Sequence, residues 1–81
     1  MRRLSELALG QSTRISGFCA HSPYAARLKA LGFRVGAPVK CVCVAPFGKT
    51  AVYRTDEGFI ALRNNEADAV FTDLPDKEVR P

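Results

Sequence analysis

A single short helix, set among segments that alternate like strands, is the feature that most constrains how this chain can fold. Ser22 and Pro23 form a start signal, because a serine hydroxyl can cap the free amides of the first turn and proline fits the first helical position. Gly32 can adopt the left-handed conformation that ends a helix. The apolar face of this helix consists of Tyr24, Leu28 and Leu31. A helix of about ten residues is unstable alone in water, so it must pack against the rest of the chain.

The remaining segments favour strands joined by turns. Residues 12–18, 39–45, 50–55, 59–63 and 70–72 are rich in β-branched, aromatic or apolar side chains. Gly17 interrupts the first segment and predicts a bulge or a tight bend. These elements predict a mainly β protein, a small SH3-like barrel of about five strands with one short helix between the first two strands.

The short connecting segments and the core follow from the same pattern. We expect residues 4–9 to turn Leu4 and Leu7 inward, and residues 64–69 to form one helical turn capped by an asparagine. The core is predicted to contain Ile15, Leu28, Leu31, Val42 and Leu62. With 81 residues, one domain is expected over residues 1–74, followed by a flexible C-terminal tail over residues 75–81.

The charge pattern narrows the possible partners. A net charge of +4 is compatible with solubility alone or with an acidic partner. The basic residues are scattered along the sequence, so we expect no nucleic-acid partner, and no glycine-rich phosphate loop is present. No apolar run approaches the roughly 18 residues that span a bilayer, and Glu6 interrupts the N-terminal apolar segment. We therefore expect a cytoplasmic protein that reaches a membrane only through a partner.

Three cysteines and one histidine are the candidates for metal chemistry. Cys41 and Cys43 lie two apart in a predicted strand, so we expect their side chains to share a face. Together with Cys19 and His21 they could supply three thiols and one imidazole to zinc or iron. A thiol-based metal-binding or sensor protein is therefore the alternative function. The spacing differs from that of common zinc motifs, and buried cysteines often act as small apolar fillers, so we expect free thiols and no required cofactor.

Catalysis has little support, whereas protein docking has more. No glycine-rich nucleophile turn surrounds any cysteine, and no third orienting group accompanies the histidine, so we expect no enzyme. Phe47 lies in a turn between Pro46 and Gly48, where its own chain need not bury it. Two interpretations remain open at this point: Phe47 docks on a partner, or it folds under the hairpin as a plug.

The order of short motifs along residues 4–72 resembles the FeoA family of the bacterial ferrous iron uptake system. The motifs are Leu-Ser-Glu-Leu at 4–7, Ile-Ser-Gly-Phe at 15–18, Leu-Gly-Phe at 31–33 with Gly36, Ala-Pro-Phe-Gly at 45–48 and Phe-Ile-Ala-Leu-Arg at 59–63. The helix exit and the turn are specific in combination, although each is weak alone.

The resemblance implies an SH3-like barrel without catalytic activity. It also implies an accessory or regulatory role toward the FeoB membrane transporter, whose cytosolic GTPase domain is the expected partner. The partner surface would comprise the helix and the turn at residues 46–49, with Arg27, Leu31, Pro46, Phe47, Gly48 and Lys49. The central cysteines lie outside the family pattern, so the metal site rests on the residues of this chain alone.

Overall fold

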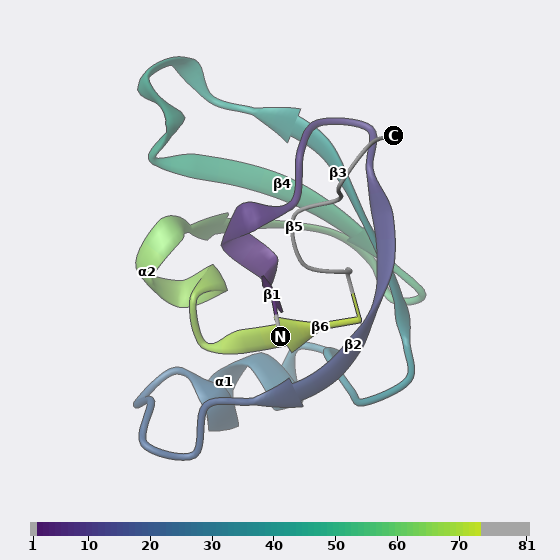
Figure 1. The fold of residues 1–81 in the computed structure, drawn as a ribbon, viewed down its shortest axis with the longest axis vertical. Coiled ribbons are helices and arrows are strands. Elements are labelled where there is room, and N and C mark those ends of the chain that lie inside the picture. Colours follow the sequence, from purple (N-terminus) through teal and green to yellow (C-terminus); the bar gives the residue numbers. More distant parts are fainter. Residues whose placement is uncertain (1, 74–81) are drawn as a thin grey trace, which may run out of the picture.

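A computed structural model describes residues 2–73 and contains one curved antiparallel sheet of six strands (Figure 1). The strands are β1 Arg2–Arg3, β2 Ser12–Phe18, β3 Pro38–Val44, β4 Thr50–Thr55, β5 Gly58–Arg63 and β6 Val70–Thr72. Their order across the sheet is β1-β6-β2-β3-β4-β5. The mainly β fold is thus confirmed, with one strand more than expected, because Arg2–Arg3 pairs with β6.

Short helical segments connect the strands. These are η1 Leu4–Glu6, α1 Ala25–Ala30, η2 Pro46–Gly48 and α2 Asn64–Ala67. Because β1 precedes β2, the predicted helix lies between the second and third strands rather than the first two. None of the helices among residues 2–73 has the length and apolar character needed to cross a bilayer.

Helix α1 is shorter than predicted. The Ser22 hydroxyl accepts a hydrogen bond from the Tyr24 amide, 3.1 Å away, and Pro23 lies in this preceding turn rather than in the helix. Gly32 ends the helix with φ of 104°, as expected, and the Phe33 amide donates a hydrogen bond back to the Leu28 carbonyl at 3.1 Å, which closes the helix end.

The core lies inside the curve of the sheet. It contains Leu4, Leu7, Ile15, Leu28, Phe33, Val39, Cys41, Tyr53, Leu62 and Val70, among others. Leu4, Leu7, Ile15, Leu28 and Leu62 are therefore confirmed as buried. Two core predictions are wrong: Leu31 is 40% exposed because α1 has ended there, and Val42 is only half-buried.

Two bulges bend the sheet. The pairing of β2 with β6 shifts register between Ile15 and Gly17, which confirms the bulge predicted at Gly17. The pairing of β3 with β4 shifts between Cys41 and Cys43, because Val42 is an extra residue on β3. A bulge strengthens twist and redirects the following side chains, so this second bulge determines where the cysteines point.

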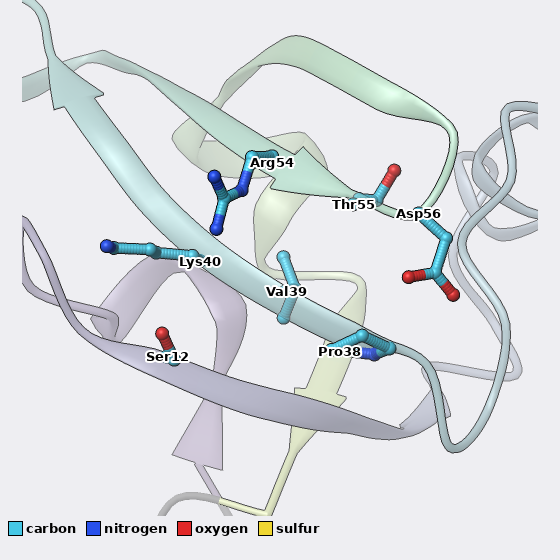
Figure 2. A pocket seen from close by; sticks show the side chains of 7 residues that line it. All are labelled: Ser12, Pro38, Val39, Lys40, Arg54, Thr55 and Asp56. Atoms are coloured by element: carbon cyan, nitrogen blue, oxygen red, sulfur yellow. The ribbon is translucent and has the colours of Figure 1, made fainter.

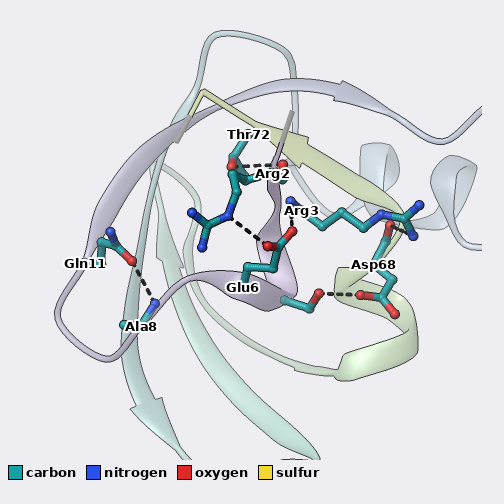
Figure 3. A network of polar contacts seen from close by, with 8 residues as sticks. Arg2, Arg3, Glu6, Ala8, Gln11, Asp68 and Thr72 are labelled. Carbon is teal, nitrogen blue, oxygen red and sulfur yellow. Dashed lines mark hydrogen bonds and ion pairs between the residues drawn. The ribbon is translucent and has the colours of Figure 1, made fainter. Parts of the chain in front are cut away.

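Polar contacts fasten the N-terminal segment to the end of the domain (Figure 3). The Glu6 carboxylate accepts from the Arg3 amide and the Arg2 guanidinium, each at 2.8 Å, and these contacts hold the Glu6 pKa below its usual value. The Ser5 hydroxyl donates to the Asp68 carboxylate next to α2, and the Thr72 hydroxyl donates to the Arg2 carbonyl. Hydrogen bonds therefore join β1 and η1, at the start of the described chain, to α2 and β6 at its end.

Candidate functional site

Among residues 2–73, the turn between β3 and β4 carries the most exposed large apolar side chain. Phe47 is 96% exposed and adopts φ of 75°, the left-handed region that non-glycine residues rarely occupy. The interpretation of Phe47 as a plug beneath the hairpin is therefore wrong. We call residues 46–49 the hairpin tip, and Figure 1 shows this tip at the far end of the β3–β4 hairpin from the β4–β5 turn.

Hydrogen bonds hold the hairpin tip in place although its aromatic ring is free. The Gly48 amide donates to the Ala45 carbonyl at 3.0 Å, which closes the turn. Asn64, the first residue of α2, donates its side-chain amide to the Gly48 carbonyl at 2.7 Å and its backbone amide to the Lys49 carbonyl at 3.0 Å. Phe47 is thus presented to solvent from a backbone that is fixed on both sides.

Helix α2 also connects to α1, the other part of the predicted partner surface. The Arg27 guanidinium pairs with the Glu66 carboxylate at 2.6 Å, and the Asn65 side chain donates to the Tyr24 hydroxyl at 3.1 Å. Leu31 lies at the end of α1 and is partly exposed. Within residues 2–73, no hydrogen bond or ion pair joins Arg27 or Leu31 to the hairpin tip, whereas α2 makes polar contacts with both parts of the predicted surface.

The hairpin tip and its surroundings present apolar area next to one positive charge. Val44, 44% exposed, lies just before the tip and adds apolar area beside Phe47. Lys49 is the only charged residue of residues 46–49 and is exposed. An aromatic side chain with an adjacent cation fits an apolar pocket with an acidic rim on another protein.

The bulge at Val42 separates the two central cysteines. Cys41 lies opposite Tyr53 and is buried, whereas Cys43 lies opposite Val52 and is exposed. The expectation that both thiols share a face is therefore wrong. Burial raises the pKa of the Cys41 thiol, which makes this sulfur a poorer metal ligand and nucleophile.

The other two metal candidates do not complete a site around either thiol. Cys19 is half-buried in the segment after β2, where its amide donates to the Ala69 carbonyl at 2.8 Å, and His21 is exposed. Across residues 2–73, no three side chains of the His, Cys, Asp and Glu types gather closely enough to hold a metal ion.

The structure also joins residues that the sequence leaves apart. Lys40 of β3 lies directly opposite Arg54 of β4, and Arg54 lies directly opposite Phe59 of β5. Two of the basic residues that look scattered in the sequence are therefore neighbours on the outer face of the sheet. The Arg54–Phe59 pair follows from a two-residue turn at Asp56 and Glu57, but the Lys40–Arg54 pair depends on the long-range register of β3 with β4.

Comparison with known proteins gives consistent matches. The family model for the FeoA domain matches residues 2–73. FeoA of Stenotrophomonas maltophilia, solved in complex with zinc and described as a prokaryotic SH3 domain protein, is 32% identical, with a TM-score of 0.79 and coverage of 90% of this chain and 91% of that chain. FeoA of Chlorobium tepidum is 26% identical, with a TM-score of 0.78 over 99% of this chain and 81% of that one.

Two further structures extend the comparison. Iron(II) transport protein A of Clostridium thermocellum is 31% identical, with a TM-score of 0.79 over 88% of this chain and 44% of that chain. A manganese-dependent transcriptional repressor has a TM-score of 0.79 at 14% identity, so it shares the fold alone. No curated protein sequence matches the chain.

Proposed function

Since the chain belongs to the FeoA family and hence to the ferrous iron transport system, we propose that it regulates the FeoB transporter by docking on its cytosolic GTPase part. The hairpin tip, residues 46–49, is the proposed contact, and α1 with Arg27 and Leu31 forms a second part of the surface. The protein would act in the cytoplasm and reach the membrane only through FeoB. It would supply no reacting group, in keeping with a family of small accessory proteins of transport.

The observation that supports this proposal is the conformation of Phe47. A non-glycine residue in the left-handed conformation costs about 1–2 kcal/mol of folding free energy. Because the Phe47 ring is 96% exposed, it buries almost no apolar area in its own domain that would offset this cost. Backbone strain of this kind is concentrated at binding and switching sites. Burial of the ring against a partner would supply the stabilisation that the ring lacks within its own fold.

Docking of this kind can act on the transporter without chemistry. If FeoB alternates between two conformations of its GTPase part, a protein that binds one of them more tightly shifts the equilibrium toward it. Because Asn64 fixes the backbone of the tip, little conformational freedom is lost when Phe47 binds, which favours affinity.

The test is binding of the purified cytosolic domain of FeoB, measured by calorimetry. Phe47→Ala should weaken binding by roughly 30-fold or more, the loss typical of a central aromatic anchor, while its circular dichroism spectrum stays unchanged. Phe59→Ala removes another exposed ring from a different part of the sheet and should bind like the unchanged protein. Full affinity in a folded Phe47→Ala variant, or an equal loss in both variants, would count against the tip as the docking site.

The alternative, a thiol-based zinc or iron binder, is motivated by the zinc complex of the Stenotrophomonas relative. It is weakened by the opposite directions of Cys41 and Cys43, and we propose that docking needs no resident metal. Protein dialysed after zinc loading should hold far less than one equivalent. Near-stoichiometric zinc that is lost on Cys41→Ser or Cys43→Ser would favour the alternative.

A further inference from the structure

A row of four residues crosses the outer face of the sheet at the end away from the hairpin tip. Ser12 of β2 lies opposite Lys40 of β3, Lys40 lies opposite Arg54 of β4, and Arg54 lies opposite Phe59 of β5. Residues directly opposite each other share a face, with Cβ atoms about 4.5–5.5 Å apart. The row therefore places a hydroxyl, two cations and an aromatic ring, in that order, on adjacent strands.

The two cations in this row are not neutralised. Neither Lys40 nor Arg54 has an ion pair with any carboxylate of residues 2–73. Asp56, two residues beyond Arg54 in the sequence, pairs with Arg34 at 3.5 Å instead. Like charges directly opposite on neighbouring strands destabilise a sheet, so the pair is a local cost to the fold.

The same residues line a hollow in the surface (Figure 2). It has a volume of about 160 Å³ and is bounded by Ser12, Pro38, Val39, Lys40, Arg54, Thr55 and Asp56. Figure 2 shows Ser12, Lys40 and Arg54 on three neighbouring strands, with the Arg54 guanidinium turned from β4 toward β3. A ligand at the Ser12 end of this hollow would meet two positive charges and one hydroxyl, whereas the Asp56 carboxylate, which also lines the hollow, pairs with Arg34.

We propose that this hollow binds a phosphate group. The Lys40 ammonium and the Arg54 guanidinium would donate charge-assisted hydrogen bonds to the phosphate oxygens, and Ser12 would add a neutral one. Phe59 is 70% exposed and lies one strand beyond Arg54, where a nucleobase attached to the phosphate can stack on the ring. The ligand class is therefore a phosphate, with a nucleoside phosphate as its favoured source.

The test is a heteronuclear NMR titration of the full chain with inorganic phosphate and, separately, with ADP, at constant ionic strength. The amide signals of Ser12, Lys40 and Arg54 should shift and saturate. Lys40→Gln and Arg54→Gln should each weaken binding about tenfold or more, the loss of one charge-assisted contact. Lys29→Gln removes the same charge from α1, outside the hollow, and should leave the affinity within about twofold, since distant exposed charges are largely screened.

A thermal measurement separates specific binding from the general effect of phosphate on folded proteins. Without phosphate, Lys40→Gln and Arg54→Gln should raise the melting temperature, because each removes the repulsion between the pair. With phosphate, the unchanged protein should gain more in melting temperature than either variant does. Equal gains in all proteins, unsaturated shifts spread over the whole surface, or full affinity in both variants would overturn the site.

The two ligands also identify the source of the phosphate. Tighter binding of ADP that Phe59→Ala reduces to the level of inorganic phosphate supports a nucleoside phosphate. Equal binding of both ligands, unchanged by Phe59→Ala, supports the site with free phosphate as its ligand. The hollow and the hairpin tip lie at opposite ends of the β3–β4 hairpin, so the FeoB binding experiment and this titration can succeed or fail separately.

Discussion

Replacing Phe47 by glycine should make the protein more stable, although the change removes the most exposed large apolar side chain of the described domain. The expected gain is the relief of the left-handed backbone, about 1–2 kcal/mol. It is offset by the greater freedom of glycine in the unfolded chain, about 0.5–1 kcal/mol. Because the ring is 96% exposed, its loss removes almost no buried area. The free energy of unfolding should therefore rise by about 0.5–1 kcal/mol.

For a domain of this size the gain corresponds to an increase in melting temperature of about 2–8 °C. Urea unfolding followed by circular dichroism, together with calorimetry, measures both quantities. Phe47→Ala is the matched control, because alanine keeps the Cβ atom and with it most of the backbone strain. Its stability should stay within about 0.5 kcal/mol of the unchanged protein.

The refuting result is a loss of stability in Phe47→Gly of about 1 kcal/mol or more. Such a loss would mean that the ring packs on its own domain, and the argument for docking through Phe47 would fall with it. A gain in Phe47→Ala as large as that in Phe47→Gly would instead show that the strain does not come from the backbone. A glycine variant that is more stable but binds FeoB less tightly is the combination that a strained docking residue requires.

Three further measurements test the placement of individual side chains. Leu28→Ala should lower the free energy of unfolding by about 2–5 kcal/mol, whereas Leu31→Ala, at a partly exposed position, should cost less than about 1 kcal/mol; similar losses would contradict the end of α1 at this point. A thiol reagent followed by peptide mapping should modify Cys43 long before Cys41, because Cys41 is buried and its pKa is raised; equal rates would argue against the bulge. Burial raises the pKa of Tyr53 to about 12, so its contribution to stability is complete below pH 10 and declines between about pH 10 and 12 as the unfolded tyrosine ionises first. Tyr53→Phe should show a shallower decline over that interval, and superimposable pH profiles would exclude this contribution.

Local turn chemistry was enough to predict most of the fold. Glycine and proline positions marked the limits of four strands to within about two residues, the usual uncertainty of such boundaries, and Gly17 marked the bulge in β2. Strand β1 could not be predicted, because two residues carry no periodicity and Arg2–Arg3 is extended only through its pairing with β6. Tertiary pairing rather than local preference therefore determined the strand that was missed.

The helix shows the limit of capping signals. Ser22 and Pro23 fit a helix start equally well whether the helix begins at once or after a turn, and in the structure a turn comes first. The shorter helix places Leu28 on the core and leaves Leu31 at its end, so only one of these two leucines could fill the interior. A three-residue spacing predicts a shared face only while both residues remain helical.

The hairpin tip was predicted as a turn, but the position of its ring was not. The Pro46-Phe47-Gly48 sequence requires a turn whether or not the ring is covered, because coverage depends on which surface lies beneath it. Here α2 contacts the hairpin tip through Asn64, a polar residue that donates a hydrogen bond to the Gly48 carbonyl and provides no apolar surface on which the Phe47 ring could pack. The exposure of Phe47 is thus a consequence of a contact between segments that are about sixteen residues apart.

One inserted residue, Val42, connects the failure of the metal prediction to the shape of the candidate docking site. Without the bulge, Cys43 would lie opposite Ala51, a buried position, and both thiols would face the core; with it, Cys43 lies opposite Val52 and faces outward. The same insertion increases the twist of the hairpin, whose tip extends beyond the body of the sheet in Figure 1. Alternation in the sequence cannot reveal such an insertion, because valine fits either face of a strand. The bulge that separates the two thiols therefore also contributes to the twist of the hairpin whose tip holds Phe47 away from the core. The same local feature thus removes the expected pair of thiols on one face and favours the exposure of the candidate docking residue.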